Sequence, residues 1–148
     1  MTNQDENKDE NKEGIVGMIN PRRYGIERIA YLLMRLSGLG LLAYFIAHIY
    51  ETSSILKGQV GWNEFLELTQ TNAGHAILAI VIGMCVFHTV NGIRVMLGHG
   101  GVGVGKPARP DYPYPPASQN IRHKMGIYSA IILASIAMMY GLAVMFGE

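Results

Sequence analysis

The hydrophobic residues of this chain gather in three long stretches, and polar segments separate them. Each stretch is longer than the roughly 20 residues that a helix needs to cross about 30 Å of hydrocarbon, and none alternates as a strand does. Because a segment inside a bilayer must satisfy its own backbone hydrogen bonds, the pattern predicts transmembrane helices. We place these helices at about residues 29–51, 73–97 and 125–146.

The remaining segments complete the expected organisation. Residues 1–17 are polar, charged and repetitive, which predicts a disordered tail. Residues 18–148 then form one membrane-anchor domain, an all-α transmembrane bundle of three helices, with an irregular Gly/Pro-rich link over residues 98–124. A soluble bundle is the alternative, but helices that are apolar on nearly every face would need far more protein to cover them.

Basic residues are concentrated on one side of the expected bundle. The other side, which holds residues 51–72 and the C-terminus, carries Lys57 against several glutamates. Cytoplasmic segments of membrane proteins are enriched in Lys and Arg, so we predict that the N-terminus and the link lie in the cytoplasm. The basic residues on the cytoplasmic side are Arg22, Arg23, Arg28, Arg94, Lys106, Arg109, Arg122 and Lys124.

The composition narrows the possible functions. The 148 residues are 49% hydrophobic and 16% charged with a net charge of +1, so nothing favours nucleic-acid binding. Cys85 is the single cysteine, which rules out a disulfide within the chain. The spacing of Gly100 and Lys106 matches a phosphate-binding loop, but Pro107 stands where such a loop needs Ser or Thr, and no strand precedes it.

Two histidines interrupt the apolar stretches, His48 in the first and His88 in the second. Ionisable groups inside a membrane are rare and are commonly functional. Because consecutive helices run in opposite directions, His48 falls in the outer half of the bilayer and His88 in the inner half. One metal ion cannot easily bind both, so the pattern favours two cofactors at two depths, and haem suits an apolar site with a neutral imidazole ligand.

A rival interpretation assigns both haems to the second helix through His75 and His88. These residues are 13 positions apart, a rotation of about 220°, so their rings would point away from one another. His75 also lies at the mouth of the helix, where an interfacial or capping role is less costly. Nearby glycines admit two interpretations, room for a flat macrocycle or close contact between helices. These glycines are Gly38, Gly40, Gly83 and Gly92.

Two motifs resemble those of a known family. MRLSGLGLLAYFIAHIYE (Met34–Glu51) is similar to its first-helix pattern, Arg-x-Ser/Thr-Gly followed after about ten residues by His. FHTVNGIRVML (Phe87–Leu97) is similar to its second-helix pattern, His-x-x-Asn-Gly-Ile-Arg. The family is the cytochrome b556 membrane-anchor subunit of succinate dehydrogenase, and the resemblance is to the two-haem type with two anchor subunits.

The resemblance assigns roles to individual residues. It implies that His88 is an axial ligand of an inner haem b and His48 an axial ligand of an outer haem b, with the remaining ligands supplied by a second anchor subunit. It also implies a region near the cytoplasmic face that meets quinone or the haem propionates. The matching residues of that region are Arg35, Ser37 and Arg94. Tyr31 belongs to the same region but departs from the pattern, because some members have a quinone-contacting serine at its place.

The implied function is that of a multi-pass anchor in the cell membrane. Such an anchor docks a flavoprotein subunit and an iron–sulfur subunit on its cytoplasmic face, and it passes electrons from succinate oxidation to membrane quinone. On its own the chain would catalyse nothing, because the cofactors carry the redox chemistry. Two alternatives stay open, the anchor of a quinol:fumarate reductase and a haem-free structural anchor.

Overall fold

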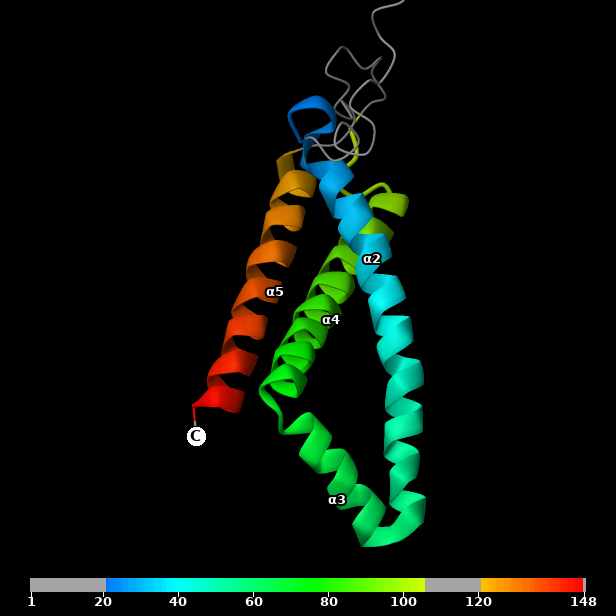
Figure 1. Cartoon of the computed structure of the whole chain (residues 1–148). Coiled ribbons are helices and arrows are strands. Elements are labelled where there is room, and N and C mark those ends of the chain that lie inside the picture. The colour runs from blue at the N-terminus through cyan, green and yellow to red at the C-terminus, as the bar shows by residue number, and fades with distance from the viewer. Residues whose placement is uncertain (1–20, 106–120, 148) are drawn as a thin grey trace, which may run out of the picture.

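The computed structural model describes residues 21–105 and 121–147, with side chains from residue 25 onwards. The tail expected over residues 1–17 and most of the expected link lie outside the described residues. The described part is helical, in agreement with the all-α prediction. Its helices are α2 (Pro21–Thr52), the 3-10 helix η1 (Ser53–Lys57), α3 (Gly58–Thr69), α4 (Asn72–His99) and α5 (Ile121–Phe146), as Figure 1 shows.

Three helices are long and apolar enough to cross a membrane: α2, α4 and α5. The 28 residues of α4 and the 26 residues of α5 correspond to about 42 and 39 Å at 1.5 Å per residue. Both lengths exceed the hydrocarbon thickness of a bilayer. The predicted three-helix transmembrane bundle is therefore confirmed, and the chain is a multi-pass membrane protein.

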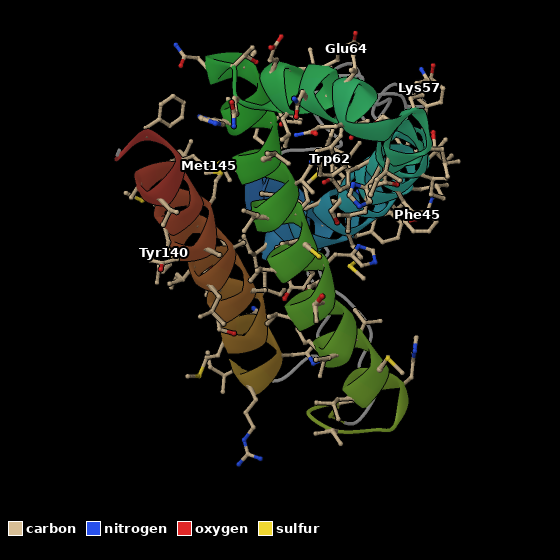
Figure 2. All side chains as sticks on the ribbon, turned by 90° about the horizontal axis from the view of Figure 1, so that it is seen from below. Phe45, Lys57, Trp62, Glu64, Tyr140 and Met145 are labelled. Carbon is tan, nitrogen blue, oxygen red and sulfur yellow. The ribbon has the colours of Figure 1, made fainter. Side chains whose placement is uncertain are left out.

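Large apolar side chains point away from the bundle, as lipid contact requires. Leu39, Phe45 and Tyr140 are 66%, 59% and 71% exposed. Figure 2 shows Phe45 and Tyr140 on the outside of the bundle. The buried positions include small residues such as Ala30 and Ala79. Small residues at helix contacts let the backbones approach closely, which is how membrane helices associate without a hydrophobic force between them.

The three spanning helices are arranged around α4, which contacts both α2 and α5. In Figure 1, α5 lies beside α4, whereas α2 approaches α4 in its first half and then diverges from it. The helices η1 and α3 bridge the gap where α2 and α4 have diverged. We call the end where α2 begins and α4 ends the N-terminal end of the bundle, and the opposite end the C-terminal end.

Local sequence explains where two of the helical segments begin. Thr71 has extended backbone angles, and its hydroxyl accepts a hydrogen bond of 3.0 Å from the backbone N–H of Gly74. This is an N-cap that satisfies one of the free N–H groups at the start of α4. Within α2, Gly25 has φ 75°, a conformation that glycine adopts without strain. The kink at Gly25 separates the first turn from the long straight part of α2.

The sequence analysis proposed no secondary structure for the segment between the first and second spanning helices. The structure shows that it forms η1 and α3. The rings of Trp62 and Phe65, three residues apart on α3, have centroids 5.3 Å apart, which is the spacing of neighbours on one helix face. Figure 2 shows Lys57 and Glu64 at the outer side of this segment.

The last spanning helix begins earlier than expected. We predicted a start near residue 125 and placed residues 121–124 in the irregular link, but α5 begins at Ile121. The first turn of α5 is held by contacts with the other helices. His123 is only 8% exposed, and Lys124 reaches Glu27 of α2. Tertiary contacts thus extend a helix into a polar stretch whose composition alone did not favour it.

Candidate functional site

His88 of α4 is held by residues of α2. Its Nδ1 atom lies 3.1 Å from the hydroxyl oxygen of Ser37, and Ser37 is only 5% exposed. The same hydroxyl donates a hydrogen bond of 3.1 Å to the backbone carbonyl of Met34, one turn earlier in α2. The His88 ring itself is half-buried. A residue of α2 therefore fixes the imidazole of a residue of α4 that is 51 positions away in the sequence.

The contact between α2 and α4 depends on a missing side chain at Gly38. A Cβ atom at this position would lie 3.0 Å from Cε1 of His88, closer than nearly all real contacts of this kind. A Cβ at Gly40 would lie 2.8 Å from Sδ of Met84, which is one turn before His88 in α4. The His88 ring thus rests directly against the backbone of α2.

Two of these glycines, Gly92 and Gly83, lie where helices contact each other closely, which is one of the two interpretations given above. A Cβ at Gly92 would meet the Met34 side chain at 3.3 Å, and a Cβ at Gly83 would meet Met138 of α5 at 3.4 Å. The glycines therefore let α2 and α5 pack on opposite sides of α4. Gly38 has the additional property that its neighbour is a histidine ring.

His48 has very different surroundings. It is exposed, and its ring stacks on Tyr44 of the same helix with centroids 5.5 Å apart and an interplanar angle of 21°. Its backbone carbonyl accepts a hydrogen bond of 2.7 Å from Thr52. These contacts are all within α2. The structure therefore presents the His48 imidazole on the outside of this chain, where another chain can reach it.

The two histidines lie at different levels along the bundle. Gly38 lies against His88, so Gly38 marks the level of the His88 ring on α2. His48 is ten residues further along the same helix, which is about 15 Å at 1.5 Å per residue. His48 is thus closer to the C-terminal end of the bundle, and the two rings cannot share one metal ion.

The residues expected near quinone or the haem propionates fall into separate places. Arg35 and Tyr31 are exposed together, with the Arg35 guanidinium carbon 4.6 Å from the centroid of the Tyr31 ring. Arg28 lies over the same ring at 5.7 Å. Such stacking of a cation on an aromatic face is attractive. Ser37 is two residues from Arg35, a rotation of about 200°, so it lies on the opposite, buried face of α2.

Arg94 belongs to a third group of residues. Its Nε atom donates a hydrogen bond of 2.9 Å to the side-chain oxygen of Asn91, which is fully buried. Glu27 of α2 is close enough to Arg94 for electrostatic attraction. The carboxylate of Glu27 also lies 4.0 Å from the ammonium group of Lys124 on α5. Arg94 thus interacts within the bundle, in addition to flanking the membrane.

His123 completes this group. It packs against Gly98 of α4, where a Cβ would lie 2.9 Å from its Cε1 atom. It also lies within electrostatic range of Arg94 and Glu27. We call the group the three-helix polar cluster, because α2, α4 and α5 each contribute. Its members are Glu27, Asn91, Arg94, His123 and Lys124.

Glu27 and His123 were missed in the sequence analysis. Glu27 follows the two arginines Arg22 and Arg23, and His123 falls near the end of the expected Gly/Pro-rich link, so the sequence analysis gave neither residue a role. One signal was available for Glu27: it is the first acidic residue after the N-terminal tail, and it lies only two residues before the first apolar stretch. Charged groups at that depth need a partner.

Two cavities lie beside the contact between helices α2 and α4. One, of about 250 Å³, is lined by residues around Ser37 and Phe87. The other, of about 540 Å³, lies nearer the C-terminal end, between α2, α3 and α4. The larger cavity is within the size range of small-molecule sites. Its lining includes Tyr44, which stacks on His48, and Met84, which packs on Gly40.

The imidazoles of His88 and His48 are donors of a kind that could hold haem. Within residues 21–105 and 121–147, no group of three or more His, Cys, Asp or Glu side chains is placed to hold a metal ion. Haem iron needs only axial ligands from protein, because the macrocycle fills its other positions. A single imidazole held at Nδ1, such as that of His88, is suited to that role. His48 also offers a single imidazole, and it is exposed.

Comparison with known proteins identifies the family. No curated protein and no solved structure matches the chain. A family model does match, over residues 17–114 of the 148, a range that contains both predicted motifs and most of the residues described above. The matched segment covers α2, α3 and α4 and therefore includes Ser37, His48 and His88. The chain belongs to the succinate dehydrogenase/fumarate reductase transmembrane subunit family.

Proposed function

We propose that this chain is a haem b-binding membrane anchor of succinate dehydrogenase. In this proposal His88 and His48 would each hold one haem b at two depths, and a second anchor subunit would supply the remaining ligands. The anchor docks the flavoprotein and iron–sulfur subunits in the cytoplasm and passes electrons from succinate to membrane quinone. The chain itself supplies binding, orientation and electrostatics and has no activity alone.

One observation carries the proposal more than any other. The His88 imidazole is half-buried inside a membrane helix pair, its Nδ1 atom is 3.1 Å from Ser37, and its ring rests against Gly38. A metal-bound histidine commonly donates its other ring N–H to a neighbouring group, which fixes the ring. The contact with Ser37 leaves the second ring nitrogen of His88 available as a ligand, which is what a haem site would need.

The remaining residues have supporting roles. When bound, haem supplies a one-electron carrier inside the membrane. Arg35 and Tyr31 form an exposed pair on α2, and the guanidinium can donate hydrogen bonds to a quinone carbonyl or a haem propionate. Arg94 donates a hydrogen bond to Asn91 and is attracted electrostatically to Glu27 of α2. It therefore stabilises the end of the bundle near His88. Arg122 is exposed at the same end, where the catalytic subunits would dock.

A difference spectrum of the purified complex tests the proposal. We expect the dithionite-reduced minus oxidised spectrum to show b-type haem, and we expect His88→Ala to remove one b-type signal. His75→Ala is the matched control, because His75 is on the same helix but packs edge-on against Phe146, with ring centroids 5.3 Å apart. A complex that assembles and reduces quinone without haem would contradict the proposal and favour the haem-free structural anchor.

The physiological direction is a separate choice. The family contains anchors of both succinate dehydrogenases and fumarate reductases, and the two reactions are the same chemistry in opposite directions. We assign the succinate-oxidising direction on the motif resemblance alone. Comparing succinate:quinone and quinol:fumarate rates of the purified complex, with one quinone at a time, distinguishes the two. A quinol:fumarate rate well above the succinate:quinone rate would reassign the chain.

A further inference from the structure

The hydroxyl of Ser37 makes two contacts, one with a backbone carbonyl and one with His88. Ser37 has a single hydroxyl hydrogen and two oxygen lone pairs. Its oxygen lies 3.1 Å from the Met34 carbonyl and 3.1 Å from Nδ1 of His88. A carbonyl can only accept, so the first contact is a hydrogen bond only if Ser37 donates its hydrogen there. The second contact is then a hydrogen bond only if Nδ1–H of His88 donates to Ser37.

We propose that Ser37 is a positioning residue that holds His88 in its Nδ1–H tautomer. In a neutral imidazole one ring nitrogen carries the hydrogen and the other carries a lone pair. With the hydrogen on Nδ1, the lone pair is on Nε2, the nitrogen that can bind iron. The tautomer is a property of this chain alone, whereas its use by haem rests on the proposed function.

Gly38 makes the second contact that positions the His88 ring. The Ser37 hydroxyl fixes one edge of the ring, and the bare backbone of Gly38 supports the ring near Cε1, where a Cβ would be at 3.0 Å. Consecutive residues of α2 thus set both the tautomer and the position of a side chain on α4. Ser37 is only 5% exposed, and a hydrogen bond in such a low-dielectric place is stronger than the same bond in water.

The assignment gives Ser37 a role different from the quinone contact that the resemblance implies. Its one hydrogen is already donated to Met34, and its hydroxyl oxygen faces His88. The exposed pair of Arg35 and Tyr31 lies on the other face of α2. A quinone bound to that pair would meet Arg35 without meeting the Ser37 hydroxyl, unless Ser37 first released His88.

The first test measures the tautomer without haem. The full chain, labelled with ¹⁵N-histidine and reconstituted in phosphatidylcholine bilayers, is observed by solid-state NMR, and the His88 signals are identified by their loss in His88→Ala. We expect a several-fold excess of the Nδ1–H form in wild type. We expect Ser37→Ala to lose this excess and Ser37→Thr, which keeps a hydroxyl, to retain it. Predominance of the Nε2–H form in wild type would overturn the proposal.

The second test uses the reduction potential of the haem at His88 in the purified complex. An Nδ1–H donor bond makes the imidazole a stronger electron donor, which favours ferric iron. We expect Ser37→Ala to shift the redox equilibrium about tenfold towards reduced haem, which is about 59 mV for one electron. Ser37→Thr should stay near wild type. Equal shifts in both variants would mean that packing, and not the hydrogen bond, sets the potential, and would overturn the proposal.

Two matched controls isolate the effect. Ser129→Ala removes an exposed serine on α5 whose hydroxyl also bonds to a carbonyl three residues earlier, at 2.9 Å, so it should leave both readouts unchanged. Gly38→Ala should lower haem occupancy at His88, whereas Gly92→Ala, whose Cβ meets only the flexible end of Met34, should have little effect. A wild-type complex without haem would defeat the proposed function, while the NMR result would still decide the tautomer.

Discussion

The two ends of the bundle are held together by different forces. At the N-terminal end, Glu27, Arg94 and Lys124 bring charges from α2, α4 and α5 together, and His123 is packed among them. At the C-terminal end, α4 and α5 meet through the edge-on contact of His75 and Phe146. There α2 has diverged, and a cavity of about 540 Å³ lies between it, α3 and α4.

The two proposed haem ligands follow the same division. His88, towards the N-terminal end, is already positioned by Ser37 and Gly38 of its own chain. His48, about 15 Å further along α2, is exposed and contacts Tyr44 of its own helix. The comparison shows that this chain already positions the imidazole of His88, whereas a partner chain would have to enclose the imidazole of His48. Four predictions test this division, from the largest expected effect to the smallest.

The first prediction concerns which end faces the cytoplasm, and its outcome is all-or-none. In a Cys85→Ser background, cysteine replaces Lys57 at the C-terminal end or Val102, which is 58% exposed, at the N-terminal end. We expect an impermeant maleimide to label the Lys57→Cys variant in intact cells and the Val102→Cys variant only after lysis and denaturation. The reverse pattern would place the polar cluster outside and exchange the inner and outer sites.

The second prediction separates the two histidines in the assembled complex. His48→Ala should remove a b-type haem signal different from the one that His88→Ala removes, because the rings are at different depths. It should change the free energy of unfolding of the chain by less than about 0.5 kcal/mol, as for other exposed positions. Haem spectra and denaturation in detergent measure the two effects. Persistence of both haem signals in His48→Ala would reassign the outer ligand.

The third prediction concerns the exposed pair of Arg35 and Tyr31. Lysine keeps the charge of Arg35 but loses the planar fork of donors. We expect Arg35→Lys to lower quinone-linked succinate oxidation roughly tenfold, equivalent to about 1.4 kcal/mol. Succinate oxidation with an artificial dye, which draws electrons from the soluble subunits, serves as the assembly control and should stay near normal. Unchanged quinone activity in both Arg35→Lys and Arg35→Gln would mean that Arg35 does not contact quinone and serves only as a basic residue that sets the membrane orientation.

The fourth prediction tests the polar cluster. The Glu27 side chain is 9% exposed, and its partner Lys124 is 40% exposed. Glu27→Gln keeps the shape and removes the charge, so Arg94 and Lys124 lose their attraction to α2. We expect a loss of about 1 kcal/mol in the free energy of unfolding, a modest value because Lys124 is partly in water. Glu64→Gln on the exposed side of α3 is the control. Equal stability of the two variants would show that the cluster does not hold α2.

The sequence was sufficient for the spanning helices but not for how they meet. The apolar stretches predicted α2, α4 and α5 because length and hydrophobicity alone determine whether a helix spans a bilayer. The start of α5 at Ile121 was missed, since contacts of His123 and Lys124 with other helices hold that turn. The helix α3 was missed because it is short and its glutamates make it resemble a polar connection.

The candidate site divides in the same way. The motifs indicated His88, His48 and Arg35 as residues of interest, because ionisable groups are conspicuous in apolar sequence. The pairing of Ser37 with His88 was not predictable, since 51 residues separate them and the register between two helices is set by packing. For the same reason the sequence analysis placed Arg35 and Ser37 in one region, although they lie on opposite faces of α2.

The close approach of α2 to α4 at Gly38 and Gly40 has a mechanical consequence. The helices touch tightly there and diverge towards α3 (Figure 1), so a rotation of α2 about this contact would move the far end of α2 most. His48 is about 15 Å from the contact, and a rotation of α2 by about 10° would move its ring by roughly 3 Å. The same rotation would scarcely move Ser37, which lies at the contact beside His88. Such a rotation would thus displace one imidazole far more than the other.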